Sequence, residues 1–145
     1  MNATIRQLLD TADLLLADTG EPATPAATPV PARPTALAAV PAASTATTAS
    51  RCRGAAFALR AALESAVADR LAAHRAPRAI QEGTQRAAFL WLRGCAEAGT
   101  ARRAKAAWSQ LCLGCHYHQY EIGPTEDQLR AWRTEVAAIV ALLAH

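Results

Sequence analysis

The chain has 145 residues, of which 52% are hydrophobic, 19% charged and only 5% aromatic. This composition is typical of a globular protein with one domain and excludes collagen-like and wholly disordered chains. The charge is uneven, because residues 51–110 carry eleven bases against four acids, whereas residues 1–21 and 111–145 each carry more acids than bases. Fourteen of the fifteen bases are arginines, a residue suited to bidentate binding of carboxylates and phosphates.

A first helix is predicted over residues 4–17, because the apolar residues there recur at three- and four-residue steps. The segment that follows is rich in Pro, Ala and Thr, and it holds six of the eight prolines: Pro22, Pro25, Pro29, Pro31, Pro34 and Pro41. Such a composition cannot bury enough apolar surface to offset its ordering entropy. We therefore expect an N-terminal helix over residues 1–17, a disordered linker over 18–49 and a helical bundle domain over 50–145.

Four more helices are predicted within that domain, over residues 50–74, 85–98, 101–120 and from 126 onward. Gly99 is expected to cap the C-terminus of the second of them, and Trp91 is placed in its apolar stripe. The last helix should begin with a capping box made by Thr125 and Gln128. Since no segment alternates as a strand does, the predicted fold class is all-α: an antiparallel bundle of four to five helices joined by short turns.

The sequence predicts a cytoplasmic protein that does not enter a membrane. The first apolar stretch is interrupted by Asp10 and Asp13, and the longest uncharged apolar run covers only residues 136–144, far short of the ~20 residues that span a bilayer. In the cytoplasm the four cysteines are expected to be reduced.

The segment Cys112-Leu-Gly-Cys115-His116 matches the pattern of c-type haem attachment. Attachment requires export, which the N-terminus does not support, and the single methionine is Met1, which leaves no obvious methionine as second axial ligand. We therefore expect no haem and no other cofactor.

Zinc is an alternative for the same segment, through Cys112, Cys115 and His116. On a helix, however, both cysteines fall within the apolar stripe, while His116 and His118 flank it on opposite sides. This geometry favours buried core thiols, so no metal is predicted.

The two histidines lie at the edge of that apolar face, where an imidazole can meet both a neighbouring helix and solvent. Their polar ends, and that of Tyr120, need hydrogen-bond partners. We expect the partners to be Arg60, Glu64 and Arg86 on adjoining helices. These side chains form the predicted binding site, and His116 and His118 are the candidates for catalysis.

Five segments carry a family resemblance: Arg60-Ala-Ala-Leu63-Glu64, Arg75-Ala-Pro77, Gln85-Arg86-Ala-Ala-Phe-Leu90, Ala107-Trp108-Ser-Gln-Leu111, and Cys115-His116-Tyr-His118-Gln-Tyr120-Glu121-Ile-Gly-Pro124-Thr125. Over about residues 51–136 the chain resembles short uncharacterised actinobacterial proteins of the HEPN-like α-helical class. The resemblance implies a helical bundle from a toxin–antitoxin or defence system. The ribonuclease signature of that class, an arginine and a histidine separated by four to six residues, is absent, so inherited nuclease activity is not expected.

Two functions remain open on this basis. The first is a non-catalytic interaction module, dimeric, whose Arg-rich middle contacts a partner protein or nucleic acid. The second is a degenerate or atypical ribonuclease or nucleotide-binding enzyme that uses His116, His118 and Arg86. The two differ in whether these side chains and Arg60 converge on one solvent-reachable cleft.

Overall fold

The computed structural model describes residues 2–17, 47–116 and 123–145. These residues form six helices and no strand: α1 (Ala3–Ala17), α2 (Thr48–Ala73), α3 (Arg78–Gln81), α4 (Gln85–Cys95), α5 (Ala98–His116) and α6 (Glu126–Leu143). The prediction of an all-α fold is confirmed. The predicted linker lies outside the described residues up to position 46, but its last residues belong to α2, whose N-terminus is capped by the Thr47 side chain.

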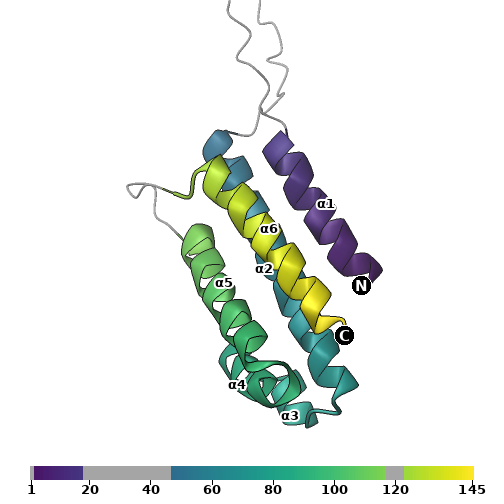
Figure 1. Ribbon diagram of the computed structural model, residues 1–145. Helices are drawn as coiled ribbons and strands as arrows, with labels where there is room; N and C mark the ends of the chain where they lie inside the picture. The colour runs from purple at the N-terminus through teal and green to yellow at the C-terminus, as the bar shows by residue number, and fades with distance from the viewer. Residues whose placement is uncertain (1, 18–46, 117–122) are drawn as a thin grey trace, which may run out of the picture.

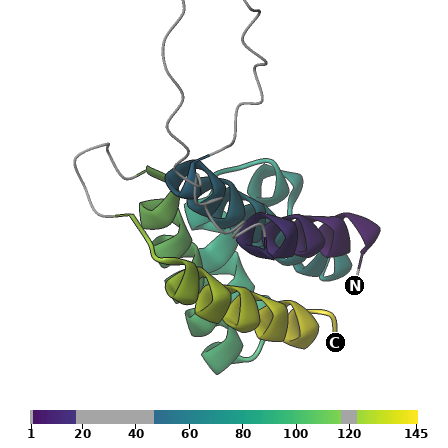
Figure 2. The same cartoon turned by 90° about the horizontal axis from the view of Figure 1, so that it is seen from above.

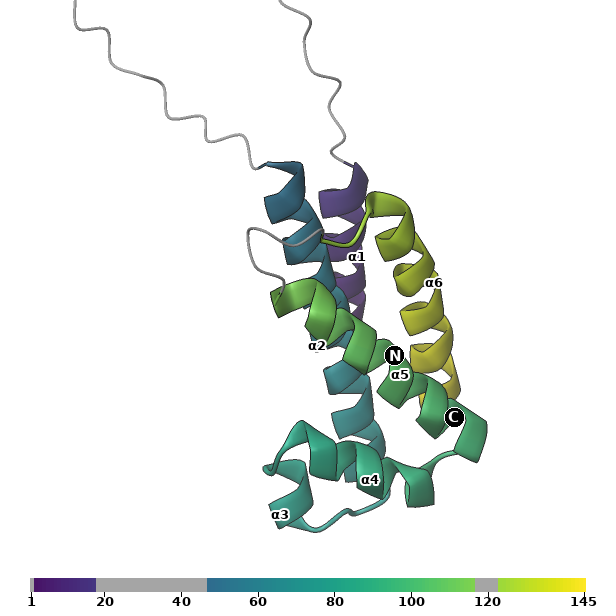
Figure 3. The same ribbon diagram turned by 90° about the vertical axis from the view of Figure 1, so that its left-hand side faces the viewer.

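The four long helices α1, α2, α5 and α6 run up, down, up and down along the bundle, and α3 and α4 lie at one end of it (Figures 1 and 3). Seen from above, α1 and α5 lie on opposite sides of α2 (Figure 2). Among the helices described, α2 alone contacts all the others. None of these helices is long and apolar enough to cross a membrane.

Helix α2 can hold this central place because its buried side chains cover a wide arc of the helix and many of them are small. Leu59 and Leu63 are fully buried, and the same helix carries five buried alanines: Ala55, Ala56, Ala58, Ala62 and Ala66. An alanine side chain ends at Cβ, so helix axes can approach closely where two such residues meet. Gly114 on α5 extends this close contact, since a Cβ there would lie 3.0 Å from Trp132 and 3.5 Å from Ala56.

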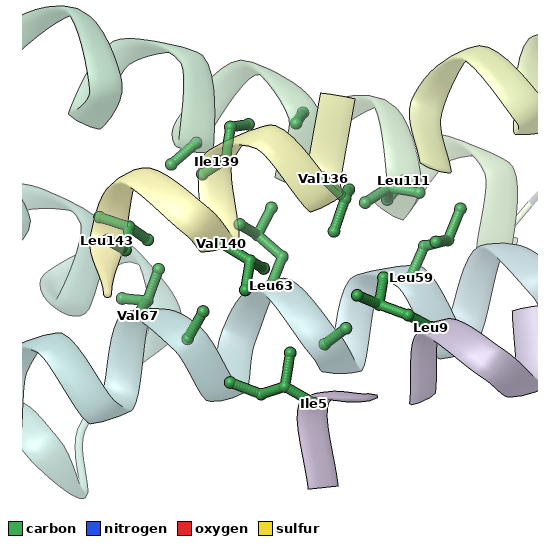
Figure 4. Packing of buried hydrophobic residues seen from close by; sticks show 14 of the residues in the cluster. Ile5, Leu9, Leu59, Leu63, Val67, Leu111, Val136, Ile139, Val140 and Leu143 are labelled. Atoms are coloured by element: carbon green, nitrogen blue, oxygen red, sulfur yellow. The ribbon is translucent and has the colours of Figure 1, made fainter. Parts of the chain in front are cut away.

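The core gathers apolar stripes from the long helices (Figure 4). Ile5 and Leu9 come from α1 and Leu111 from α5, and they meet residues from α2 and α6: Leu59, Leu63, Val67, Val136, Ile139, Val140 and Leu143. These residues repeat at the helical spacing that the sequence shows. The stripes predicted for α1, α2 and α6 are therefore largely confirmed as the buried faces of those helices.

Helix α4 departs from its predicted boundaries and buried face. Trp91 was expected in the apolar stripe, yet it is 40% exposed, because α4 turns Phe89 into the core instead. The helix ends at Cys95, so Gly99 does not cap it. Gly99 lies in the first turn of α5, which begins before the predicted position 101.

The early start of α5 is explained by Glu97. Its carboxylate accepts hydrogen bonds from the backbone N–H groups of Gly99 and Thr100 at 2.7 and 2.8 Å, which satisfies two donors that a helix start leaves unpaired. At the other end α5 is described to His116, and its predicted extension to residue 120 lies outside the described residues. The capping box at Thr125 and Gln128 is confirmed.

Glu97 provides a test of this helix start. The hydrogen bonds from Gly99 and then Thr100 hold the pKa of Glu97 below its ordinary value of 4.5. A carboxyl whose pKa is lower in the folded state stabilises the fold above its unfolded pKa, and this stabilisation is lost as the pH falls through the folded pKa. We expect Glu97→Ala to lower the Tm at pH 7, with the deficit relative to the parent shrinking below pH 4.

Thermal unfolding followed by circular dichroism across this pH range measures the effect. Glu97→Gln, which keeps a hydrogen-bond acceptor and loses the charge, should fall between the parent and Glu97→Ala at pH 7. A deficit of equal size at pH 7 and pH 3 would contradict the assignment of the ionised carboxylate as the cap.

Candidate functional site

Arg60 lies at the centre of a polar cluster between α2 and α5, which we call the Arg60 cluster: Phe57, Arg60, Glu64, Trp108, Cys112, Cys115 and His116. Its Nε lies 3.1 Å from Glu64 Oε1, and its Nη1 lies 3.3 Å from His116 Nε2. The guanidinium carbon also lies 5.6 Å from the centre of the Phe57 ring, which itself meets the His116 ring edge-on. Because an arginine can only donate, His116 Nε2 is the acceptor in this contact.

Glu64 joins the two helices at this point. Its Oε1 accepts a hydrogen bond of 2.7 Å from Trp108 Nε1 while it pairs with Arg60. The arrangement follows from helical spacing: Arg60 and Glu64 are four residues apart on α2, and Trp108, Cys112 and His116 are spaced by four on α5. Each set therefore lies along one side of its helix, and the two sides face each other.

The cysteines of the cluster are poor nucleophiles in this setting. Cys115 is buried, as predicted, and Cys112 is half-buried. Burial raises the pKa of both thiols above the ordinary value of 9.0, although the nearby Arg60 guanidinium opposes the shift. Both thiols are therefore protonated at neutral pH, and a protonated thiol is unreactive. In the described ranges, no three His, Cys, Asp or Glu side chains are placed to hold a metal ion.

The structure brings together three of the predicted site residues, Arg60, Glu64 and His116. It places Arg86 elsewhere, in a groove beside Trp108, while His116 lies eight residues or about 12 Å further along α5. His118 and Tyr120 lie outside the described residues.

That groove, the α4–α5 groove, is a cavity of about 530 Å³. It is lined by Arg86, Phe89, Leu90, Arg93, Ala101, Arg102, Lys105 and Trp108. Helical spacing again explains the lining, because Arg86, Leu90 and Arg93 lie at steps of four and three on α4, and Ala101, Lys105 and Trp108 lie at the same steps on α5. Phe89 and Trp108 meet in its wall with ring centroids 5.4 Å apart.

Three of the four cations of the α4–α5 groove are uncompensated, whereas Arg102 lies close enough to Glu97 to help lower the pKa of that carboxyl. No acidic residue lines it, and Arg86, Arg93 and Lys105 form no ion pair with any described residue. Several arginines elsewhere on the surface are paired, as in the contact of Arg103 with Glu135 at 2.8 Å between α5 and α6, whereas Arg6 and Arg75 also form no ion pair with any described residue. Unpaired cations around an apolar floor are suited to an anionic ligand that also carries apolar or aromatic groups.

Arg93, Arg102 and Lys105 were not singled out from the sequence. The signal that could have found them is their spacing, which puts Arg93 on the same side of α4 as Arg86, and Lys105 on the same side of α5 as Trp108. Whether these two sides share one groove depends on how α4 packs against α5. The spacing of residues within a single helix does not determine that packing.

Comparison with known proteins gives no relative to set beside this geometry: no family model matches the chain, and no curated protein or solved structure is significantly similar to it. The residues themselves therefore carry the functional argument.

Glu64 is the residue on which the Arg60 cluster depends most. Removing its carboxylate by Glu64→Ala leaves the Trp108 N–H without its acceptor and Arg60 without its counter-ion. We expect the free energy of unfolding, measured by urea denaturation, to fall by about 1–3 kcal/mol.

The matched control is Glu82→Ala, which breaks an arginine pair of the same four-residue spacing in which both side chains are well exposed. Its effect should stay below about 0.5 kcal/mol. Equal losses in the two variants would mean that the Glu64 contacts contribute no more than a surface ion pair.

Proposed function

We propose that the protein is a non-catalytic, HEPN-like helical module that binds nucleic acid through the α4–α5 groove. The observation that carries this proposal is the set of four cations, Arg86, Arg93, Arg102 and Lys105, around one groove whose lining contains no carboxylate. Cations such as these replace the counter-ions condensed on a polyanion, and the release of those counter-ions favours binding.

The charge distribution of the whole chain supports the same assignment. The groove lies within the segment from residue 51 to 110, where eleven bases stand against four acids. Three of the four groove cations are arginines, which bind phosphate oxygens in bidentate geometry. A partner protein with an acidic surface would use the same charges, and it is the alternative that the experiment below separates.

The enzymatic alternative, a ribonuclease that uses His116, His118 and Arg86, receives less support. Arg86 and His116 belong to different surfaces, and His116 accepts a hydrogen bond from Arg60 in place of a free role as acid or base. The raised pKa of the Cys112 and Cys115 thiols also argues against a thiolate nucleophile. Self-association into a dimer and residence in the cytoplasm stay predictions.

The test is the double variant Arg86→Gln/Arg93→Gln, assayed for binding of a fluorescent RNA by anisotropy over a series of salt concentrations. We expect weaker binding at low salt and a smaller dependence of log K on log salt, by about one for each phosphate that the variant no longer neutralises. Both side chains are exposed and unpaired, so the Tm should stay within a degree or two of the parent.

Arg6→Gln is the control, since Arg6 is an exposed arginine on α1 and lines none of the groove. Binding of the double variant at parental affinity would overturn the assignment of the groove. Binding of an acidic peptide in preference to RNA would favour the partner-protein alternative. RNA cleavage that disappears in His116→Ala would favour the enzyme.

A further inference from the structure

The floor of the α4–α5 groove differs from the flat basic surface that binds a duplex through its phosphates alone. We infer that the groove takes unpaired bases of a single-stranded nucleic acid and stacks them against Trp108. This inference rests on the proposed function and specifies which form of nucleic acid the groove binds.

The floor is apolar and partly open to solvent. Its opening comes from Leu90, whose side chain is 56% exposed, and from the half-buried Trp108 in the wall, while Phe89 and Ala101 behind them are buried. In a duplex the faces of the bases are covered by their neighbours in the stack, whereas an unpaired base exposes both faces. The faces of unpaired bases can therefore contact an apolar floor and an aromatic wall, whereas the stacked bases of a duplex cannot.

Trp108 is held in place before any ligand arrives. Its N–H donates to Glu64 at 2.7 Å, and its ring lies 5.4 Å from Phe89 at an angle of 48°. A wall fixed in this way loses little conformational freedom on binding, so more of the stacking energy appears as affinity. Glu64 is thus a positioning residue for the groove, although it belongs to the Arg60 cluster.

The cations lie on both helices that border this floor. Arg86 and Arg93 are two turns apart on α4, about 10 Å along its axis, and Arg102 and Lys105 are about 4.5 Å apart along α5. Phosphates on either side of a stacked base can therefore meet a positive charge. This pairing of an aromatic wall with flanking bases is the general means by which proteins bind single strands without reading their sequence.

The experiment measures the affinity of the full chain for a single-stranded RNA of about twelve nucleotides and for a duplex of the same sequence, at one low salt concentration. We expect the single strand to bind at least about tenfold tighter. Trp108→Ala should weaken single-strand binding by about fivefold to a hundredfold, and Trp108→Phe should retain most of the affinity because it keeps an aromatic face.

Two further variants make the test independent of folding defects at Trp108. Leu90→Ala changes an exposed side chain on the floor, so it should lower single-strand affinity several-fold without lowering the Tm. Trp91→Ala is the matched control, since Trp91 is an exposed tryptophan on the same helix that does not line the groove, and its variant should bind as the parent does.

The two proposals fail in different ways. Equal affinity for duplex and single strand, or parental single-strand affinity in both Trp108→Ala and Leu90→Ala, would overturn the stacking inference while leaving the groove as a nucleic-acid site. Absence of binding to either RNA at low salt would overturn the proposed function and this inference together.

Discussion

The close packing of the other helices on α2 is the constraint from which the rest of the structure follows. An ordinary surface helix buries one stripe, but α2 buries residues around most of its circumference, and five of these are alanines. Small side chains let α1, α5 and α6 approach closely from different directions. Gly114 has the same effect from the side of α5, where Trp132 and Ala56 occupy the space that a larger residue would need.

Both candidate surfaces depend on where this packing places α5. One side of the helix faces α2 and completes the Arg60 cluster, in which Glu64 holds Arg60 and Trp108 together. The next side faces α4 and completes the α4–α5 groove. Trp108 belongs to both, so the Glu64 carboxylate that pairs with Arg60 also fixes a wall of the groove. A stabilising contact and a binding surface are therefore joined through one indole ring.

The sequence determined much of the architecture by itself, because helical periodicity and helix caps are local properties. The buried stripe of α6, its capping box at Thr125 and Gln128, and the burial of Cys115 all follow from residues within a few positions of each other. The pairing of Glu64 with Arg60 is local in the same sense, since Arg60 lies one turn away on the same helix.

The tertiary structure alone decided which helix sides share a surface. Arg86 was expected beside His116, yet it lies with Arg93, Arg102 and Lys105, because α4 lies at one end of the bundle and faces the first half of α5. Trp91 is exposed and Phe89 buried through the same placement. Periodicity defines which residues share a side of one helix, but the angle and height at which two helices meet depend on the volumes of side chains that are distant in sequence.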